Sequence, residues 1–346
     1  MSTGVVLLNF GEPERPTRES VVDYLERIFL ANADLDEDGK TQSAEDRAEK
    51  LARRRAPGLI EEYEEIDGSP LRPQAARQAD LIQRELEDRG HDVRTYLGMQ
   101  HTEPFIPDAV SQAHADGVDR LVGVPMYPLC GPSTNVESLQ RLRAAVTEAA
   151  WDVEVNELVG WHRHPGYTRV RTQNIERFLS TRGLSIDDNT RLVFSAHGTP
   201  IHYLEDGSRY VTYVEEFCET VAALLGGVPY ELGYQNHENR GIDWTEPDVE
   251  TVVKKVDADR IVVEPVSFVH EQSETLSELD VELRKEAEEV GVDFYRVPIP
   301  YDDNRFIGAI SDLLEPFLAD FDPGYYQLRQ CNCRDAPGAF CLNAPR

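Results

Sequence analysis

The sequence contains very little lysine. Of the 346 residues, 30 are arginine and only five are lysine, whereas Asp and Glu together number 64, so the formal net charge is −29. A surface this acidic repels a phosphate backbone, which excludes nucleic acid as an expected partner. Because dissolved ions screen self-repulsion, the composition favours a halophilic protein from a cytoplasm of very high salt concentration. Most carboxylates are then expected to be solvated surface groups.

The sequence also lacks long apolar runs and a basic leader segment. No stretch approaches the roughly 18 apolar residues of a membrane span. The chain enters the apolar run GVVLLNF at residue 4, with no basic region ahead of it. We therefore expect a cytoplasmic protein without a signal peptide or transmembrane segment, and with at most peripheral membrane contact.

Short runs rich in Val, Ile and Leu alternate with longer amphipathic segments, which is typical of α/β proteins with parallel sheets. The segment 32–58 is polar and is interpreted as a surface excursion. The predicted strands are 5–10, 93–98, 121–126, 153–158, 192–196, 230–235, 261–266 and 294–297, and the predicted helices are 18–31, 73–89, 134–149, 169–182, 210–225 and 274–290.

The two halves of the chain resemble each other. LLNFGEP (7–13) is similar to VFSAHGTP (193–200), YLGMQH (96–101) to LGYQNH (232–237), and VDRLVGVPMYP (118–128) to ADRIVVEPVSF (258–268). We therefore expect two similar domains, 1–160 and 161–320, with a ligand in the cleft between them. The Cys-containing segment 321–346 is expected to be a tail appended to this fold.

One histidine follows a predicted strand directly. In VFSAHGTP, His197 comes after the apolar run and before glycine, which places its imidazole at the carboxyl edge of a sheet, where α/β proteins bind ligands. There it could accept a proton or bind a metal ion. A structural histidine at a turn is the alternative.

Four glutamates follow another strand at helical spacing. In SFVHEQSETLSELDVEL, Glu271, Glu274, Glu278 and Glu282 stand at i, i+3, i+7 and i+11, so one helix face would carry all four. A row of carboxylates at a cleft can relay protons or pass a divalent cation. The alternative is a solvated acidic stripe.

The cysteines are clustered near the end of the chain. Cys331, Cys333 and Cys341 lie within the last 16 residues, and an odd total of five argues against a disulfide framework. With Cys130 as a fourth thiolate, this pattern fits a [2Fe–2S] cluster or a structural zinc ion. Cys218 lies in an amphipathic segment and is expected to be a small buried hydrophobic residue.

With these stretches the chain resembles the ferrochelatase family, whose members insert Fe(II) into a porphyrin in heme biosynthesis. The resemblance implies two Rossmann-type, chelatase-like domains around a porphyrin cleft. The matching stretches, in family order across most of residues 4–316, are LLNFGEP, RRRAPGLIEEYEEIDGSPLRPQ, GVPMYPLCGPST, FSAHGTP, YQNHENRGIDWTEP and FVHEQSETLSELD.

The resemblance also implies roles for individual residues. His197 matches the family's active-site histidine and Glu274 the glutamate across the cleft, so His197 is expected to accept protons with Glu274 as its partner. Glu278 and Glu282 fall on a helix that the family uses as an acidic path, so all four are candidate contacts for the Fe(II) substrate. Residues at positions expected to line or approach the porphyrin pocket are Phe10, Tyr63, Ser69, Pro70 and Trp244.

Three features differ from many relatives. Phe10 stands where Met or Tyr is common, so axial ligation from it is not expected. Gln272 replaces a histidine, and Gln100 with His101 replaces an Arg-Tyr pair, so substrate propionates are expected to be held differently. The tail matches the cluster-bearing members in position. Because metal insertion changes no oxidation state, a cluster there is expected to fasten the tail rather than to transfer electrons.

The sequence thus predicts a ferrochelatase, a lyase with a porphyrin and Fe(II) as substrates. The charged segment 32–50 favours the tetracarboxylate coproporphyrin III over protoporphyrin IX, although adaptation to salt would also make this segment polar. The alternatives are a chelatase for another tetrapyrrole such as sirohydrochlorin, a non-catalytic tetrapyrrole or heme carrier, and an electron carrier built on the cysteine cluster.

Overall fold

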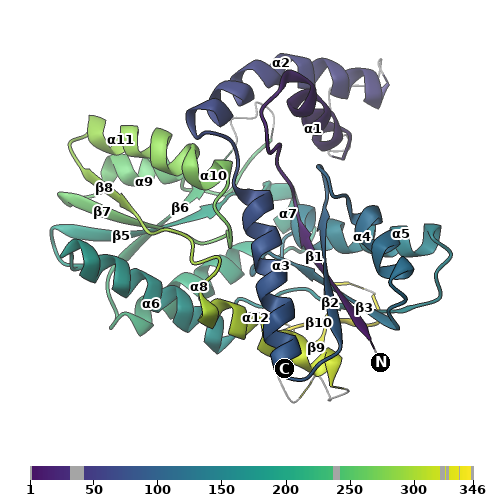
Figure 1. Cartoon of the computed structure of the whole chain (residues 1–346). Coiled ribbons are helices and arrows are strands. Elements are labelled where there is room, and N and C mark those ends of the chain that lie inside the picture. The colour runs from purple at the N-terminus through teal and green to yellow at the C-terminus, as the bar shows by residue number, and fades with distance from the viewer. Residues whose placement is uncertain are drawn as a thin grey trace.

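The computed structural model describes residues 2–31, 43–236, 242–319, 324, 327–334 and 336–343. Its strands form two sheets (Figure 1). The larger sheet has the strand order β2-β1-β3-β4-β10-β9. Its first four strands pair in parallel and are β1 (Thr3–Asn9), β2 (Val93–Met99), β3 (Arg120–Pro125) and β4 (Glu154–Leu158).

The second sheet repeats this order as β6-β5-β7-β8. In each half the first strand lies between the second and the third, so the similar sequence motifs correspond to equivalent strands. The predicted α/β architecture with two similar parallel sheets is confirmed. The strands of the second sheet are β5 (Thr190–His197), β6 (Tyr230–Gln235), β7 (Arg260–Pro265) and β8 (Asp293–Arg296).

Helices connect the strands and flank the sheets (Figure 1). Five helices, α2, α4, α7, α9 and α12, were not predicted as helices. No described helix combines the length and apolar character needed to cross a membrane. The helices are α1 (Arg18–Ala31), α2 (Ala44–Glu65), α3 (Leu71–Asp88), α4 (Ile106–Ala115), α5 (Glu137–Glu148), α6 (Pro165–Arg182), α7 (Ile201–Glu205), α8 (Tyr210–Leu224), α9 (Val249–Lys255), α10 (Ser273–Leu276), α11 (Arg284–Glu289) and α12 (Asn304–Leu318).

The segment 32–58 was predicted to be a surface excursion; residues 32–42 lie outside the described part, and most of the remainder is exposed but forms the start of the helix α2. Ser43 caps the helix by accepting a hydrogen bond from the backbone of Asp46 at 3.1 Å. The buried residues on its first turns are the small side chains Ala48, Ala52 and Ala56, which gave little apolar signal. With α1 it forms a layer at the top of the molecule (Figure 1).

The predicted helix 274–290 is interrupted by a π-helical segment, Glu278–Leu283, between α10 and α11. A second π-helical segment, Pro132–Val136, precedes α5. Such wider turns are rare and often occur at functional sites. The segment Glu278–Leu283 carries two of the candidate glutamates, Glu278 and Glu282.

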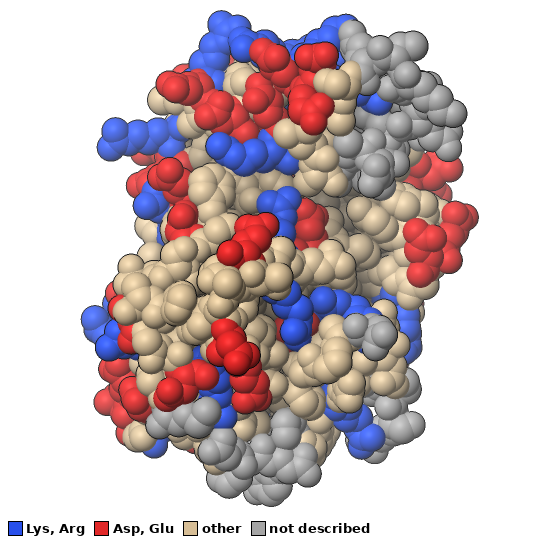
Figure 2. Space-filling model, turned by 90° about the vertical axis from the view of Figure 1, so that its right-hand side faces the viewer, with Lys and Arg blue, Asp and Glu red and all other residues tan. Residues whose placement is uncertain are grey.

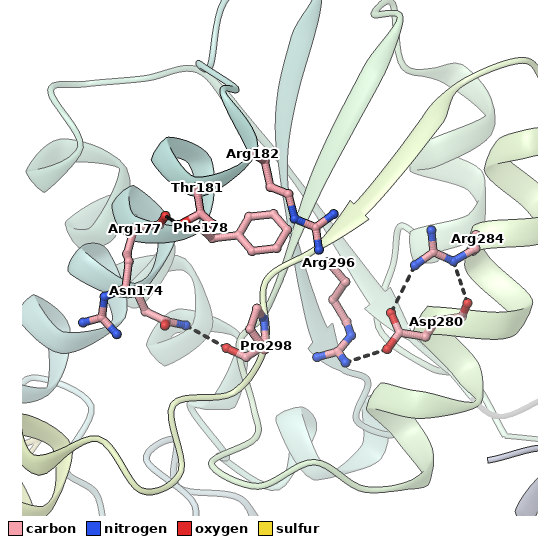
Figure 3. Close-up of a pocket in the computed structure, with 9 residues that line it drawn as sticks. All are labelled: Asn174, Arg177, Phe178, Thr181, Arg182, Asp280, Arg284, Arg296 and Pro298. Atoms are coloured by element: carbon pink, nitrogen blue, oxygen red, sulfur yellow. Dashed lines mark hydrogen bonds and ion pairs between the residues drawn. The ribbon is translucent and has the colours of Figure 1, made fainter. Parts of the chain in front are cut away.

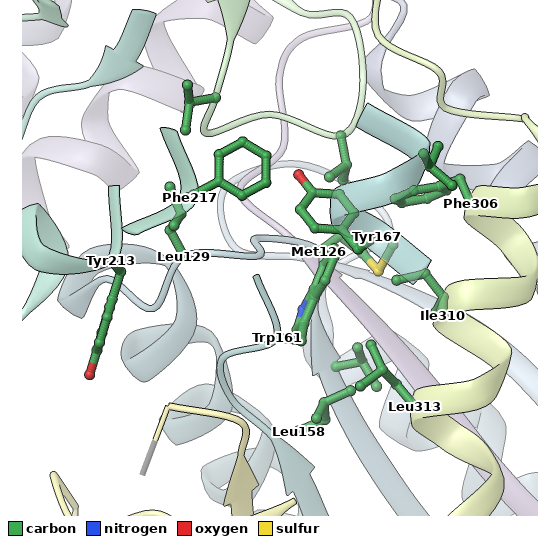
Figure 4. Close-up of a cluster of buried hydrophobic side chains, with 14 of the residues drawn as sticks. Met126, Leu129, Leu158, Trp161, Tyr167, Tyr213, Phe217, Phe306, Ile310 and Leu313 are labelled. Atoms are coloured by element: carbon green, nitrogen blue, oxygen red, sulfur yellow. The ribbon is translucent and has the colours of Figure 1, made fainter. Parts of the chain in front are cut away.

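The main hydrophobic core contains residues from both halves. Trp161 is fully buried, and its indole N–H donates to the carbonyl of Pro125 at 3.2 Å. Its ring packs edge-on against Tyr167 at 4.9 Å, and Phe306 of α12 lies beside both rings (Figure 4). The segment around residue 160, where the domain boundary is predicted, is therefore part of a core shared by both halves.

The described part of the C-terminal segment contains two short strands that join the first sheet. The strand β10 (Ala339–Cys341) pairs in parallel with β4, and β9 (Arg329–Gln330) pairs antiparallel with β10. The backbone N–H of Cys331 donates to the carbonyl of Ala339 at 2.7 Å. In its described part, the Cys-containing tail predicted over 321–346 thus extends the first sheet.

Candidate active site at the carboxyl ends of the strands

His197 is the last residue of β5, at the carboxyl edge of the second sheet, as predicted. Its Nδ1 lies 2.7 Å from the carbonyl oxygen of Gly198, and because a carbonyl only accepts, Nδ1 carries the proton. In the neutral ring the lone pair is then on Nε2. The backbone N–H of His197 donates to Ser267 at 2.9 Å, and the Tyr210 hydroxyl donates to its carbonyl at 3.0 Å.

The acidic helix, which consists of α10, the π-helical segment Glu278–Leu283 and α11, begins beside the same edge. Gln235 is the neighbour of His197 on β6, and its side-chain amide donates to the Glu274 carbonyl at 2.8 Å and to Glu278 Oε2 at 2.9 Å. The Ser195 hydroxyl donates to Gln235 Oε1 at 2.9 Å, which fixes the orientation of the amide. The structure thus brings His197, Glu274 and Glu278 to one edge of one sheet.

The carboxyl groups differ in their exposure along this helix. Glu282 is exposed, whereas Glu278 and Glu274 are half-buried. Burial raises the pKa of Glu278 well above the ordinary value, and the charge of Glu274 raises it further. The pKa of Glu282 is raised by loss of solvent and by Glu62 of α2. The row therefore leads from solvent toward the strand ends and can relay protons or cations.

Glu271 does not belong to this row, which corrects the prediction of a four-residue stripe. The helix begins only at Ser273, so Glu271 lies in the preceding loop. Its carboxylate pairs with Arg296 at 3.0 Å and accepts the backbone N–H of Ile299 at 2.8 Å. Because these partners occupy it, Glu271 has a structural position beside the site.

The five predicted pocket residues fall into two groups. Two of the aromatic residues, Trp244 and Phe10, each pack against a histidine. The ring centroids of Trp244 and His197 are 6.4 Å apart, and those of Phe10 and His101 are 4.4 Å apart. Tyr63 and Ser69 instead direct their hydroxyl groups to Glu12, and Pro70 follows them at the start of α3.

Glu12 is a site residue that the sequence reasoning missed. It lies in the turn after β1 and is only 5% exposed. Burial raises its pKa to about 7, with the charge of Glu274 adding to the effect and hydrogen bonds from Ser273 and Ser69 opposing it. Its only sequence signal was its position in LLNFGEP, the counterpart of the stretch that carries His197.

Gln272, Gln100 and His101, which the sequence analysis singled out, are all buried. Gln272 donates to Glu274 Oε2 at 2.8 Å, so it supports the glutamate. His101 is buried, and desolvation lowers its pKa to about 3, with Arg141 and Arg27 acting in the same direction. Gln100 is also buried and donates to the Ser133 carbonyl at 3.1 Å.

The four cysteines of the predicted cluster are neighbours, and all are free thiols. The pKa of Cys331 is lowered to about 6, chiefly by a hydrogen bond from the Cys341 thiol. The backbone N–H groups of Cys333 and Arg334 and the charge of Arg334 act in the same direction. Burial raises the pKa of Cys130 to about 12, and the nearby Cys331 and Cys333 add to this. Among the described residues, no three His, Cys, Asp or Glu side chains are already arranged to hold a metal ion. Cys218 is buried in α8, as expected.

A surface pocket of about 500 Å³, whose lining does not include His197, lies between α6 and the acidic helix (Figure 3). Four arginines line it, but Arg284 and Arg296 both contact Asp280, and Arg296 also pairs with Glu271. The ion pairs of Arg296 connect the acidic helix to β8 and to the loop that carries Glu271. The site of interest is therefore at the strand ends rather than in this pocket.

The arrangement at the strand ends has the chemistry of a metal chelatase. An imidazole with a fixed tautomer can accept a proton or contact a metal ion, and the nearby carboxylates can attract a divalent cation. Both kinds of group come from the second half of the chain, where β5 ends at His197 and the acidic helix follows β7.

Comparison with known proteins agrees with this class. The family model described as Ferrochelatase matches residues 2–317. The chain is 35% identical over 326 residues to the ferrochelatase of Synechococcus elongatus, covering 91% of this chain and 82% of the relative, and 29% identical over 320 residues to that of Geotalea daltonii, covering 90% and 97%. The chain belongs to the ferrochelatase family.

A solved structure shares the fold at low sequence identity. SirB from Bacillus subtilis with Fe3+ matches with a TM-score of 0.52 at 11% identity, covering 93% of this chain and 99% of that one. This likeness supports the two-sheet architecture alone.

Proposed function

We propose that this member of the ferrochelatase family inserts Fe(II) into a porphyrin through His197 and the acidic helix. The observation that carries the proposal is the meeting of His197, Glu274 and Glu278 around Gln235. A free-base porphyrin loses two N–H protons as Fe(II) enters, so the site must accept two protons and receive one dication. Imidazole and carboxylate groups can do both.

His197 is the proposed proton acceptor. Because Nδ1–H is donated to Gly198, Nε2 is the atom that would receive a pyrrole proton, and the resulting imidazolium would keep its bond to that carbonyl. Trp244 and Phe268, with ring centroids 6.4 and 6.3 Å from the imidazole, supply apolar walls that suit a planar macrocycle. Such walls can hold a bent ring through remote contacts.

The acidic helix is the proposed route for the second proton or the metal ion. Glu282 is exposed and Glu278 is half-buried, so a charge entering from solvent meets carboxylates at successive depths. Burial and the charge of Glu274 raise the pKa of Glu278, which favours uptake of a proton by this carboxylate. We assign the role of opposing partner to Glu274.

We propose coproporphyrin III as the porphyrin. The exposed surface of α2 carries interspersed acidic and basic side chains, and Figure 2 shows them over the top of the molecule. Among the described residues, the large hydrophobic side chains that are exposed are Leu30, Leu224 and Val290, far too few for an apolar lip. A tetracarboxylate substrate requires no such lip.

We further propose that Cys130, Cys331, Cys333 and Cys341 hold a [2Fe–2S] cluster. The low pKa of Cys331 favours the thiolate that a cluster needs, and the cysteines come from the loop after β3 and from the terminal strands. When bound, the cluster would join these segments. As-purified protein should show visible cluster absorption that is lost in Cys331→Ser and kept in Cys218→Ala; equal spectra would contradict the assignment.

The acidic, lysine-poor composition supports a cytoplasm of high ionic strength as the working environment. Unfolding temperature should therefore rise with KCl concentration into the molar range. A protein equally stable at low and at high KCl would contradict this.

The proposed function is tested by mixing the protein anaerobically, in KCl of molar concentration, with Fe(II) and either coproporphyrin III or protoporphyrin IX. Loss of porphyrin fluorescence over many turnovers, faster with coproporphyrin III, is the expected result. Preference for protoporphyrin IX would overturn the substrate assignment. Stoichiometric binding without turnover would identify a carrier instead.

A further inference from the structure

Glu12 is buried in a chain whose other carboxylates are mostly solvated. It lies between β1 and α1, in the first half, and its side chain has almost no contact with solvent. A buried carboxylate is stable only when hydrogen bonds replace its water. Its partners therefore show what the residue is built to do.

Four donors meet at this carboxyl group. Tyr63 of α2 donates to Oε1 at 3.1 Å, and the Ser69 hydroxyl donates to Oε2. Ser273, 261 residues away, donates through its hydroxyl and through its backbone N–H, the latter 3.2 Å from Oε2. Glu12 thereby connects the first half to the first residue of α10.

These four donors use the acceptor capacity of a carboxylate, which has about four lone-pair sites. The lone pairs of the ionised Glu12 are therefore occupied by protein donors, and none is left for a metal ion while the network is intact. Its role must be exerted through the groups that it binds.

The Ser273 hydroxyl, which donates to Glu12, also lies next to Glu274, the candidate partner of His197. The Ser273 hydroxyl lies 3.0 Å from Glu274 Oε2 as well as beside Glu12, and Gln272 donates to the same Glu274 oxygen at 2.8 Å. One hydroxyl has one proton, so it can donate to only one carboxyl group at a time. By attracting that proton, Glu12 determines which donors remain for Glu274.

We propose that Glu12 is a positioning residue of the active site, which fixes Ser273 and the start of α10 so that Glu274 is held in one orientation toward the substrates. The inference rests on the proposed function of Glu274. It deepens that function by assigning to the first half of the chain a residue that sets the geometry of the second half. Without Glu12, the Ser273 hydroxyl would turn to Glu274 and the helix start would lose its tie.

The test compares Glu12→Gln with Glu14→Gln, which removes the same charge from an exposed carboxylate paired with Arg72 at 3.0 Å. In Glu12→Gln we expect kcat/KM for Fe(II) to fall at least about tenfold, a loss of about 1.4 kcal/mol in transition-state stabilisation. The Kd for coproporphyrin III should stay within about twofold, and Glu14→Gln should match wild type.

Ser273→Ala probes the same link from the other side and serves if Glu12→Gln does not fold. We expect it to reproduce the Fe(II) defect, and the double variant to be no worse than either single variant, because one connection is removed in each case. Fe(II) kinetics in both variants equal to Glu14→Gln would overturn the proposal, as would independent, multiplying defects.

The two proposals fail differently. A wild-type protein without turnover would refute the proposed function. In that case the Glu12–Ser273 tie is judged by thermal unfolding, where the shifts of the two single variants should not add in the double variant. Additive shifts would refute the tie.

Discussion

The buried ion pair between Arg171 and Glu264 gives a specific prediction about stability. Arg171 of α6 and Glu264 of β7 each have side chains that are only 1% exposed. The Arg171 Nε donates to Glu264 Oε1 at 2.7 Å, and its other nitrogens donate to the carbonyls of Phe268 at 2.9 Å and of Pro265. The pair thus fastens the segment that leads from β7 to Ser267, the partner of His197.

Arg171→Leu would leave a buried carboxylate and two carbonyl groups without their donor. Breaking a buried pair by removing one partner costs about 3–5 kcal/mol, because the remaining charge is uncompensated. Replacing both members with apolar residues removes the charge as well, so Arg171→Leu/Glu264→Leu should recover most of this loss. We therefore expect a strongly non-additive double-mutant cycle.

Chemical unfolding followed by tryptophan fluorescence measures these free energies. Arg177→Leu on the same helix is the control, because its partner Asp303 lies at 3.3 Å and the arginine is 56% exposed. That variant should lose less than about 1 kcal/mol. An Arg171→Leu variant that loses no more than the control, or a double variant with additive losses, would refute the reasoning.

Three further predictions follow from individual contacts. In Gly233→Ala the new Cβ would lie 2.5 Å from Val249 Cα, so we expect the free energy of unfolding in a denaturant titration to fall by about 1–3 kcal/mol. Gly58→Ala, inside α2, should instead raise it by about 0.5–1 kcal/mol. Equal effects of the two substitutions would contradict this. Desolvation lowers the pKa of His270 to about 3. Below pH 6.5 the unfolded state therefore binds a proton that the folded state does not, and the free energy of unfolding decreases as the pH is lowered. At pH 5 this amounts to about 2 kcal/mol, and the slope between pH 6.5 and 5 should be smaller in His270→Leu than in the exposed His114→Leu; parallel curves would contradict it. Glu278→Gln should slow metal insertion without weakening porphyrin binding in a fluorescence titration; an unchanged insertion rate would remove Glu278 from the route.

Much of the scaffold was predictable because its signals are local. The strands β1, β3, β5 and β7 are almost continuous buried runs of Val, Ile and Leu, which parallel sheets require. His197 was predictable for the same reason, since a polar residue between a buried strand and a glycine falls at the sheet edge.

The parts that escaped prediction depend on weak or distant signals. The helix α2 buries mainly alanines over its first turns, so an apolar stripe was hardly visible. Glu12 is one acidic residue in a very acidic chain, and its partners lie 51, 57 and 261 residues away, so nothing local distinguishes it. Glu271 was assigned to the glutamate row because its spacing is helical, but the helix begins only at Ser273, so Glu271 lies outside it.

The most direct test of the central claim is a single-turnover measurement of Fe(II) insertion into coproporphyrin III by wild type, His197→Ala and His114→Ala. Porphyrin affinity is measured in parallel, and His114 serves as the exposed histidine control. If His197 accepts a pyrrole proton, His197→Ala should insert iron about 100-fold more slowly or worse, with porphyrin affinity retained and His114→Ala unaffected. Insertion by His197→Ala at a rate close to that of wild type would contradict the account.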